Sequence, residues 1–307
     1  MSVMQKQEHT KGNAIKKIGI IGLGAMGYPL AERILHSPEN YEVTVYNRTR
    51  QKADPLKDLG ARIASEPYEA AQGDVVISML ANDEAVEAVI LHDDFLLEHA
   101  ATCTHVSMST ISIDLVQRLT QEAARSGRSF VSCPVMGRPD VMARGEAISM
   151  PAGAYDAIAK ISPLLMAFSK VIRVVGDQPM QANAVKLAAN FMISSMIETF
   201  AEAFALVRKN NVDHHMFYEI MANDFFASPI YKKYGALIAN GDFAGGAFSV
   251  ELQEKDTRLA LEAAIASRVS MPFLHTLENV FISAIGRDKG AKDPCAIAEV
   301  ARENSGL

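Results

Sequence analysis

The stretch from Lys17 to Gly27, KIGIIGLGAMG, constrains the fold of this chain more than any other. Its isoleucines form a short β-branched run that is typical of a buried parallel strand. Three glycines follow with the spacing G-x-G-x-x-G. In this spacing the first glycine permits a tight turn, the second lets the backbone approach a pyrophosphate, and the third lets the next helix pack closely.

We therefore predict a strand at 17–21 and a helix at 26–35 whose N-terminal amides point at the phosphates of a dinucleotide. Glycines of a merely structural turn are the alternative. The complete context argues against it, because a strand precedes the turn, a helix follows, and a second apolar strand at 41–46 completes a βαβ unit. The cofactor-binding residues predicted in this turn are Gly22, Leu23, Gly24, Ala25, Met26 and Gly27.

The end of the second strand indicates which dinucleotide is bound. NAD-binding units usually place an acidic residue there, which holds the ribose hydroxyls. This chain has Asn47-Arg48-Thr49 instead. A carboxylate would repel a 2′-phosphate, whereas an arginine can bind it through paired, charge-assisted hydrogen bonds. The sequence therefore favours NADP(H) over NAD(H), with an ordinary solvated Arg48 as the alternative.

Strands and helices alternate through the first 178 residues. Further strands are predicted at 61–63, 74–80, 104–108, 129–134, 147–151 and 171–175, and helices at 66–72, 84–91, 114–125 and from 155 onward. This alternation predicts an α/β fold, a Rossmann-type doubly wound parallel sheet with helices on both faces. Because ligands bind outside the carboxyl ends of such strands, Asn82, Thr110 and the 134–138 turn should gather there.

The sequence changes character after residue 178. From about 180 to 209 no residue breaks a helix, and thirty helical residues would span about 45 Å. Helices are also predicted at 214–223, 230–238, 250–267 and 272–285, with Gly241, Gly245 and Gly246 marking the main loop. We therefore expect a loose tail at 1–15, a nucleotide-binding domain at 16–178, and an all-helical substrate and dimerisation domain at 179–307 that begins with a long interdomain helix.

Asn183, Lys186 and Asn190 share one face of that long helix. A lysine among alanines and leucines is desolvated, which lowers its pKa and suits it to proton transfer. Asn190 could hold the lysine or a substrate oxygen. A lysine that extends along the helix flank to reach water is the alternative, and the spacing alone does not decide between them.

Composition limits the class of partners. A net charge of −6 argues against nucleic acid or an anionic membrane as the main partner. No uninterrupted apolar run approaches the ~20 residues that span a bilayer, and residues 1–15 lack the apolar core of a signal peptide. Three scattered cysteines fit a reducing compartment, and neither they nor the histidines have metal-binding spacing. We expect a cytoplasmic protein without a metal.

Together these motifs resemble the β-hydroxyacid dehydrogenase family, which includes 3-hydroxyisobutyrate dehydrogenases and glyoxylate/succinic semialdehyde reductases. The resemblance runs from about Lys17 to Arg302. GLGAMG is similar to the family's dinucleotide signature, and the turn at 109–112, STIS, to its serine–threonine turn near the nicotinamide and its ribose. KLAAN at 186–190 is similar to the K-x-x-x-N motif of the catalytic lysine.

This resemblance implies roles for further residues. Lys186 and Asn190 would be catalytic. The cofactor contacts beyond the glycine turn and residues 47–49 would come from Leu80, Ala81, Thr110, Phe248, Lys255 and Asp256. The last three belong to a late segment that closes over the cofactor in the family. Subunits would associate through the helical domain as a homodimer or homotetramer.

One segment departs from the family pattern. Relatives commonly have P-V-S-G-G, in which the serine and glycines help to hold a substrate carboxylate, but residues 134–138 here are PVMGR. Met136 could be simple packing and Arg138 a surface charge. Alternatively, Arg138 supplies a different anion contact in a more apolar pocket. The predicted substrate-binding residues are Ser109, Met136, Gly137 and Arg138. Glu251 also stands where many relatives carry a basic residue, so neither 3-hydroxyisobutyrate nor glyoxylate is assigned as the natural substrate.

The sequence therefore predicts an NADP(H)-dependent oxidoreductase. It would transfer a hydride between nicotinamide and a small aldehyde, carbonyl compound or hydroxy acid, with Lys186 as general acid or base. An imine reductase shares this architecture, but such enzymes often replace the lysine. A non-catalytic NADP-binding protein is the second alternative, and it is hard to reconcile with an intact lysine–asparagine pair.

Overall fold

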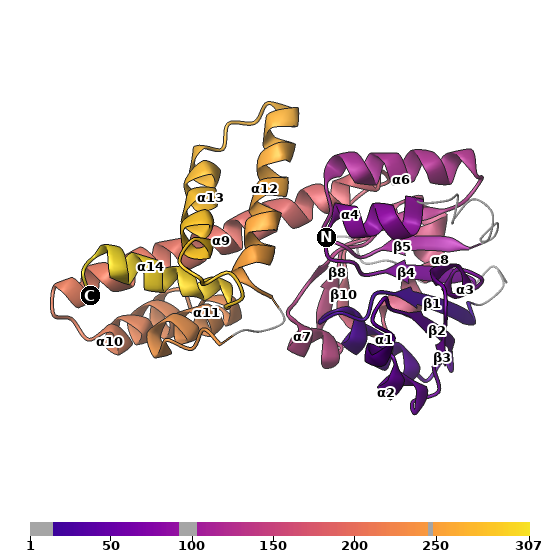
Figure 1. Ribbon diagram of the computed structural model, residues 1–307, viewed down its shortest axis with the longest axis horizontal. Coiled ribbons are helices and arrows are strands. Elements are labelled where there is room, and N and C mark those ends of the chain that lie inside the picture. Colours follow the sequence, from indigo (N-terminus) through magenta and orange to yellow (C-terminus); the bar gives the residue numbers. More distant parts are fainter. Residues whose placement is uncertain (1–14, 92–102, 245–247) are drawn as a thin grey trace.

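The computed structural model describes residues 15–91, 103–244 and 248–307, which form two halves joined by one long helix (Figure 1). In Figure 1 the mixed α/β half lies on the right and the helical half on the left. The tail predicted at 1–15 lies outside the described residues except for Ile15, as do Gly245 and Gly246 of the predicted main loop.

A seven-stranded sheet forms the centre of the N-terminal half. Its order is β3-β2-β1-β4-β5-β6-β9, and the first six strands run parallel in the arrangement typical of Rossmann folds. Strand β9 runs antiparallel to β6 at one edge. The strands are β1 (Lys17–Ile21), β2 (Glu42–Tyr46), β3 (Arg62–Ile63), β4 (Val75–Ser78), β5 (Thr104–Ser107), β6 (Phe130–Ser132) and β9 (Ala152–Gly153). The predicted α/β class is thus confirmed.

Two predicted strands do not join this sheet. Strands β8 (Ala147–Ser149) and β10 (Ser169–Ile172) form a separate three-stranded sheet with β7 (Val135–Met136), in the order β10-β8-β7. The prediction that residues 147–151 and 171–175 extend one parallel sheet was therefore wrong. A parallel neighbour needs a crossover of about a dozen residues. Only residues 137–146 separate β7 from β8, and these two strands pair antiparallel.

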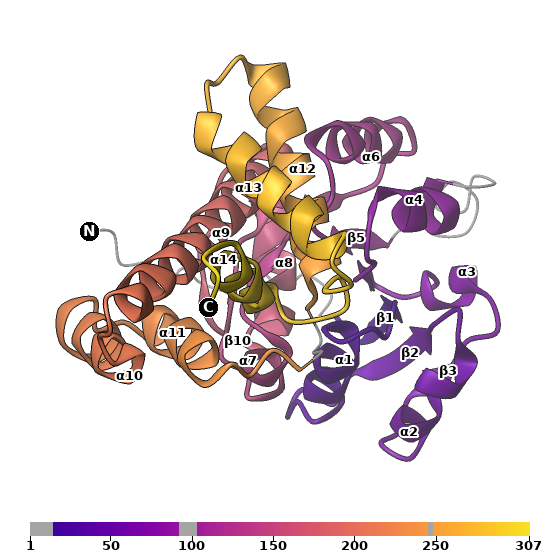
Figure 2. The ribbon, with the colours of Figure 1, turned by 60° about the vertical axis from the view of Figure 1, so that its left-hand side comes forward.

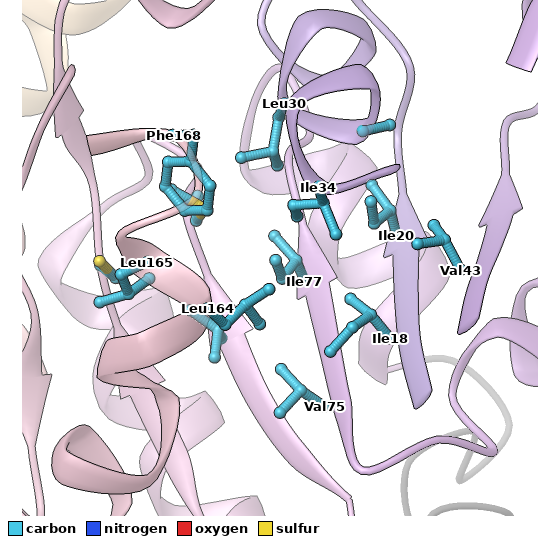
Figure 3. Packing of buried hydrophobic residues seen from close by; sticks show 14 of the residues in the cluster. Ile18, Ile20, Leu30, Ile34, Val43, Val75, Ile77, Leu164, Leu165 and Phe168 are labelled. Atoms are coloured by element: carbon cyan, nitrogen blue, oxygen red, sulfur yellow. The ribbon is translucent and has the colours of Figure 1, made fainter. Parts of the chain in front are cut away.

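Helices cover both faces of the large sheet. Ile18 and Ile20 of β1 face one side, where they pack with Leu30 and Phe168 (Figure 3), whereas Ile21 belongs to the cluster on the other side. This alternation follows from the period of two in a strand. The helices of this half are α1 (Gly27–Leu35), α2 (Asp54–Lys57), α3 (Pro67–Ala70), α4 (Asp83–Val86), α6 (Ile113–Arg125), α7 (Pro139–Ala143) and α8 (Tyr155–Leu165), with short helical turns η1 (Arg50–Lys52) and η2 (Glu87–Leu91).

Helix α9 (Met180–Lys209) connects the halves and has the predicted bounds. Near its start, Asn183 Nδ2 donates to the Ile111 carbonyl (3.0 Å) and Asn183 Oδ1 accepts from Ser132 Oγ. Its later residues belong to the core of the helical half. By length and composition alone α9 could cross a membrane, but half of its most apolar stretch is buried within the protein, as in the core helix of a globular fold.

The remaining helices pack around α9 (Figure 2). Helices α12 and α13 have the predicted bounds, whereas α14, which packs along α9, was not predicted. The elements are α10 (His214–Tyr218), η4 (Glu219–Phe225), α11 (Pro229–Asn240), α12 (Val250–Ser267), α13 (Pro272–Ile285), η5 (Pro294–Ala296) and α14 (Ile297–Asn304).

Glu198 on α9 gives the helical half a pH-dependent stability. It is 6% exposed, and its Oε2 has no hydrogen-bond partner among the described residues. Burial, together with the charge of Glu202, raises the pKa of Glu198 from 4.5 to about 7. The folded chain therefore holds this proton more tightly than the unfolded chain does, so the stability it contributes is complete below about pH 4.5 and is lost as the pH rises through 7.

We expect Glu198→Gln to raise the free energy of unfolding at pH 8 by up to about 3 kcal/mol. At pH 4.5 the gain should fall below about 1 kcal/mol, because the folded state then holds the proton and the unfolded state holds it about half of the time. Urea unfolding at the two pH values measures the difference. Glu262→Gln, at an exposed position on α12, is the control and should change little. An equal effect of Glu198→Gln at both pH values would contradict the prediction.

Candidate active site

The glycine turn after β1 leaves space for a ligand. Gly22 has φ +98°, and a Cβ there would lie 2.3 Å from the Met79 carbonyl oxygen. A Cβ at Gly27 would lie 1.9 Å from the Gly22 carbonyl oxygen. By contrast, a Cβ at Gly24 would meet no atom within 4 Å. The backbone at Gly24, beside the start of α1, therefore faces open space of the kind that a pyrophosphate needs.

Asn47 fastens the end of β2 to this turn. Its Oδ1 accepts from the Leu23 amide and its Nδ2 donates to the Thr49 carbonyl, each at 2.9 Å. Arg48 is exposed, and its guanidinium makes no ion pair with any residue that the structure describes. The side chain predicted to bind a 2′-phosphate is thus free to do so, while the Asn47 side chain is engaged with backbone.

Lys186 lies where α9 meets the sheet half. Its Nζ donates to the Val135 carbonyl at 2.9 Å and lies 3.8 Å from Met136 Sδ. Burial lowers the pKa of this amine; the negative charge of Asp256 opposes the shift and the positive charge of Lys255 adds to it. The amine therefore points into the protein, and the alternative of a lysine that extends to reach water does not describe it.

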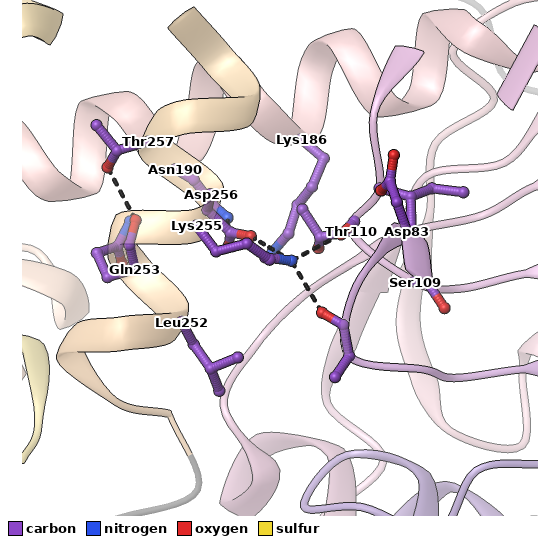
Figure 4. A network of polar contacts seen from close by, with 12 residues as sticks. Asp83, Ser109, Thr110, Lys186, Asn190, Leu252, Gln253, Lys255, Asp256 and Thr257 are labelled. Carbon is purple, nitrogen blue, oxygen red and sulfur yellow. Dashed lines mark hydrogen bonds and ion pairs between the residues drawn. The ribbon is translucent and has the colours of Figure 1, made fainter. Parts of the chain in front are cut away.

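A polar network lies beside Lys186 (Figure 4). Asn190 Nδ2 donates to Asp256 Oδ2 at 2.5 Å, and the other oxygen of Asp256 forms an ion pair with Lys255 Nζ at 2.8 Å. Lys255 Nζ also donates to the carbonyls of Ala81 (3.0 Å) and Thr110 (2.8 Å). The network thus joins α9 and α12 to the loops that follow β4 and β5. Asn190 holds Asp256, a partner that the sequence did not indicate.

The loops after β4 and β5 are held together by their own polar groups. Ser109 Oγ accepts from the Leu80 amide at 2.8 Å, and Asp83 Oδ1 accepts from the Ser112 amide at 3.0 Å. Ser112 caps α6 by accepting from the Leu115 amide. Ser109 is 1% exposed, so its hydroxyl is occupied within the protein. Asp83 was not among the residues predicted from the sequence. Its place shortly after the predicted strand at 74–80 was the feature that could have identified it.

Arg138 is not a free surface charge. Its Nη2 donates to Asp293 Oδ2 at 2.7 Å, and its guanidinium carbon lies 5.7 Å from the centre of the Tyr234 ring. Burial works against the charge of Arg138, but the hydrogen bond and charge of Asp293 outweigh it and raise the pKa of Arg138. Asp293 and Tyr234 belong to the helical half, and no sequence pattern linked them to Arg138.

The structure therefore brings together most of the predicted residues. The glycine turn and residues 47–49 lie at the ends of β1 and β2. Lys255 contacts the loops after β4 and β5, next to the Asn190–Asp256 pair, and Lys186 contacts β7. Phe248 lies just before α12, next to its N-cap Ser249. The backbone at Gly24 faces open space, and burial lowers the pKa of the Lys186 amine, which suits this amine to proton transfer to or from a bound molecule.

Both halves of the chain match models of known protein families. Residues 17–176 match the NAD binding domain of 6-phosphogluconate dehydrogenase. Residues 181–301 match the model described as NAD-binding of NADP-dependent 3-hydroxyisobutyrate dehydrogenase.

Full-length relatives agree with these matches. The chain is 39% identical to the uncharacterized oxidoreductase YfjR of Bacillus subtilis, over 92% of the chain and 98% of that protein. It is 34% identical to the NAD-dependent L-serine dehydrogenase of Pseudomonas aeruginosa, over 84% of the chain and 88% of that protein.

Solved structures share the fold. The 3-hydroxyisobutyrate dehydrogenase of Mycobacterium tuberculosis with L-serine has a TM-score of 0.83 at 23% identity, covering 94% of this chain and 99% of that one. An imine reductase from Pseudomonas sp. gives a TM-score of 0.62 at 23% identity, covering 94% of this chain and 99% of that one.

Proposed function

Because this chain belongs to the β-hydroxyacid dehydrogenase family, we propose that it is an NADP(H)-dependent reductase in which Lys186 is the general acid or base. Family membership makes it an oxidoreductase that uses a nicotinamide dinucleotide. The proposed substrates are small aldehydes, 2-oxo acids and the corresponding hydroxy compounds. The observation that supports this proposal best is the partly buried amine of Lys186, which donates to the Val135 carbonyl and lies four residues from Asn190.

The described residues fit the cofactor. We assign the pyrophosphate to the turn that contains Gly24, where the backbone faces open space, and the 2′-phosphate to the free guanidinium of Arg48. The remaining proposed contacts are Leu80, Ala81 and Thr110 toward the nicotinamide and its ribose, and Phe248, Lys255 and Asp256 over it. Relatives include an NAD-dependent enzyme, so the preference for NADP(H) depends on Arg48 and its neighbours.

When bound, the cofactor supplies or accepts a hydride at its nicotinamide ring. In reduction, protonated Lys186 gives its proton to the oxygen of the carbonyl as negative charge develops there, and in oxidation the neutral amine takes the proton from the hydroxyl. The lowered pKa of Lys186 brings both forms of the amine nearer to the working pH. Asn190 acts by holding Asp256, and so α12, beside this amine.

The substrate-binding residues divide into two kinds. The Met136 sulfur lies 3.8 Å from Lys186 Nζ, so we assign Met136 and the adjacent Gly137 to contact with substrate. Ser109 and Arg138 already bond within the protein, and we assign them to shaping the pocket. A thioether in this place favours a less polar substrate than a hydroxyl would.

Oxidation of NADPH, compared with NADH, tests this function. The panel consists of glyoxylate, succinic semialdehyde, other small aldehydes and 2-oxo acids, and cyclic imines. We expect turnover of an aldehyde or oxo acid with a preference for NADPH. Turnover of cyclic imines alone would indicate an imine reductase. Tight NADPH binding without turnover of any compound, including hydroxy acids with NADP⁺ in the reverse direction, would indicate a non-catalytic binding protein.

We also propose that copies of this chain associate through the helical half, as a dimer or tetramer in the cytoplasm. Large apolar side chains on α9, α12 and α13 are more than half exposed in the single chain, among them Met192, Leu206, Ile265 and Ile282. Exposed apolar surface of this kind is typical of association sites.

A further inference from the structure

We propose that Arg138 is a positioning residue for Lys186. By fastening the 134–138 turn to Asp293 and Tyr234 of the helical half, it holds the Val135 carbonyl and the Met136 sulfur against the lysine amine. The expected effect on turnover rests on the proposed function of Lys186. The expected effect on the ionisation of Lys186 does not, and it can be measured without any substrate.

The 134–138 turn is the element that holds the amine. Lys186 Nζ donates to the Val135 carbonyl at 2.9 Å, and Met136 Sδ lies 3.8 Å away. Only Gly137, whose φ is +147°, separates Met136 from Arg138. Val135 and Met136 form β7, which pairs with β8, and glycine leaves the backbone after this strand free to adopt many conformations. An anchor beyond the glycine therefore adds to this strand pairing in fixing where the Val135 carbonyl lies.

Arg138 provides that anchor. Its ion pair with Asp293 is 2.7 Å long, and the two side chains are 21% and 5% exposed, respectively. Asp293 is itself fixed, because its Oδ1 accepts from the Cys295 amide at 3.0 Å. The planar guanidinium also lies over the Tyr234 ring, a contact that the ammonium of a lysine does not reproduce. The anchor thus crosses between the two halves of the chain.

A second link between the halves is weaker. Lys233 Nζ lies 3.1 Å from both oxygens of Asp140 on α7. The Lys233 and Asp140 side chains are 40% and 48% exposed, and ion pairs so open to water contribute little. The Arg138–Asp293 pair is shielded from water more fully, so it is the stronger of these two links and the one that anchors the 134–138 turn.

Arg138 acts on Lys186 through the turn and not by its own charge. Among the described residues, the charged groups that face Lys186 are Asp256 and Lys255, both on α12, while the 134–138 turn contributes only a carbonyl and a thioether. Loss of the anchor would loosen the turn and admit water to the amine. Since burial is the main cause that lowers the pKa of Lys186, hydration should raise it.

The test measures the ionisation of Lys186 in the full-length chain. Lysine side chains are labelled with ¹³C, and the Lys186 resonance is assigned by its loss in Lys186→Met. We expect Arg138→Met to raise the pKa of Lys186 by about one unit, toward its ordinary 10.5, and Arg138→Lys to raise it by less. Arg144→Met is the matched control. Arg144 lies six residues further along the chain, is exposed, and forms its ion pairs among the described residues with Asp140 and Glu146 alone. This substitution should leave the pKa unchanged.

A double variant separates positioning from general stability. Arg138→Met leaves the Asp293 carboxylate buried without its partner, which should lower the Tm. Arg138→Met combined with Asp293→Asn removes that charge, so most of the lost Tm should return while the pKa of Lys186 stays raised. If Arg138→Met alone fails to fold, the pKa of Lys186 is measured in the double variant instead. A pKa that is unchanged in the folded variants, or that returns together with the Tm, would overturn the proposal.

Kinetics distinguish positioning from direct contact with substrate. In reduction, the pH above which kcat declines should rise in Arg138→Met together with the pKa of Lys186, with a small change in KM. A KM raised tenfold or more with an unchanged pKa would mean that Arg138 binds substrate, which would overturn the proposal. If Lys186→Ala kept normal turnover, the proposed function would fail, but the ¹³C measurement would still decide whether Arg138 positions Lys186.

Discussion

Replacing Lys186 with methionine should lower kcat by about a thousandfold and leave the affinity for NADPH near that of the wild type. General acid–base catalysis by one side chain contributes about 10²–10⁴-fold, and methionine keeps most of the buried packing while removing the proton. The amine contacts the Val135 carbonyl and lies next to Met136, away from the glycine turn proposed to bind the cofactor phosphates. Steady-state NADPH oxidation gives kcat, and NADPH fluorescence gives the Kd.

Two further variants show whether the proton itself matters. Lys186→Arg keeps the positive charge but cannot release a proton at any working pH, so its kcat should also be very low. Lys209→Met, at the exposed end of the same helix, should have the kcat of the wild type. Turnover by Lys186→Met within a fewfold of the wild type would remove Lys186 from the chemistry.

Replacing Arg48 with glutamate should reverse the cofactor preference. The kcat/KM for NADPH should decline by about a hundredfold, which corresponds to about 2.7 kcal/mol, because paired charge-assisted hydrogen bonds to the 2′-phosphate are replaced by repulsion. The value for NADH should stay the same or improve, since a carboxylate at this point can hold the ribose hydroxyls. The ratio of the two values, measured with one substrate, checks the prediction.

The matched control for Arg48 changes the same charge elsewhere. Lys57→Glu alters an exposed residue at the end of α2 and should leave the ratio of NADPH to NADH use unchanged. Arg48→Ala should lie between the wild type and Arg48→Glu. If Arg48→Glu weakened both cofactors equally, Arg48 would stabilise the turn and would not select the 2′-phosphate.

The parts of the fold that the sequence predicted correctly carry strong local patterns. The β-branched strand before the glycine turn, and the uninterrupted helices α9 and α12, could be delimited because their signals lie within a few residues of one another. Strands β8 and β10 were assigned to the wrong sheet because short apolar segments do not reveal their partners. Helix α14 has only eight residues, and its position depends on packing against α9.

In the candidate site, too, local spacing could be predicted from the sequence, whereas long-range contacts could not. The spacing from Gly22 to Gly27 and from Lys186 to Asn190 is visible within a single helix or turn. The partners of these residues are not, since Asp256 is 66 residues from Asn190 and Asp293 is 155 residues from Arg138. The first pair exists because α12 packs against α9, and the second because the segment before η5 reaches the sheet half. A single sequence gives no measure of such packing.

Helix α9 has a consequence for recombination between relatives. The side chain proposed to move the proton lies on this helix, whereas the side chain proposed to select the cofactor follows β2 in the sheet half. A crossover placed in the turn at 176–179 would therefore transfer Lys186 together with the helical half and leave Arg48 with the other parent. Such a chimera would need a compatible Ser132 and Ile111, because Asn183 near the start of α9 bonds to both. If these hydrogen bonds of Asn183 are kept, a chimera can take its cofactor preference from one parent and its proton-transferring residue from the other.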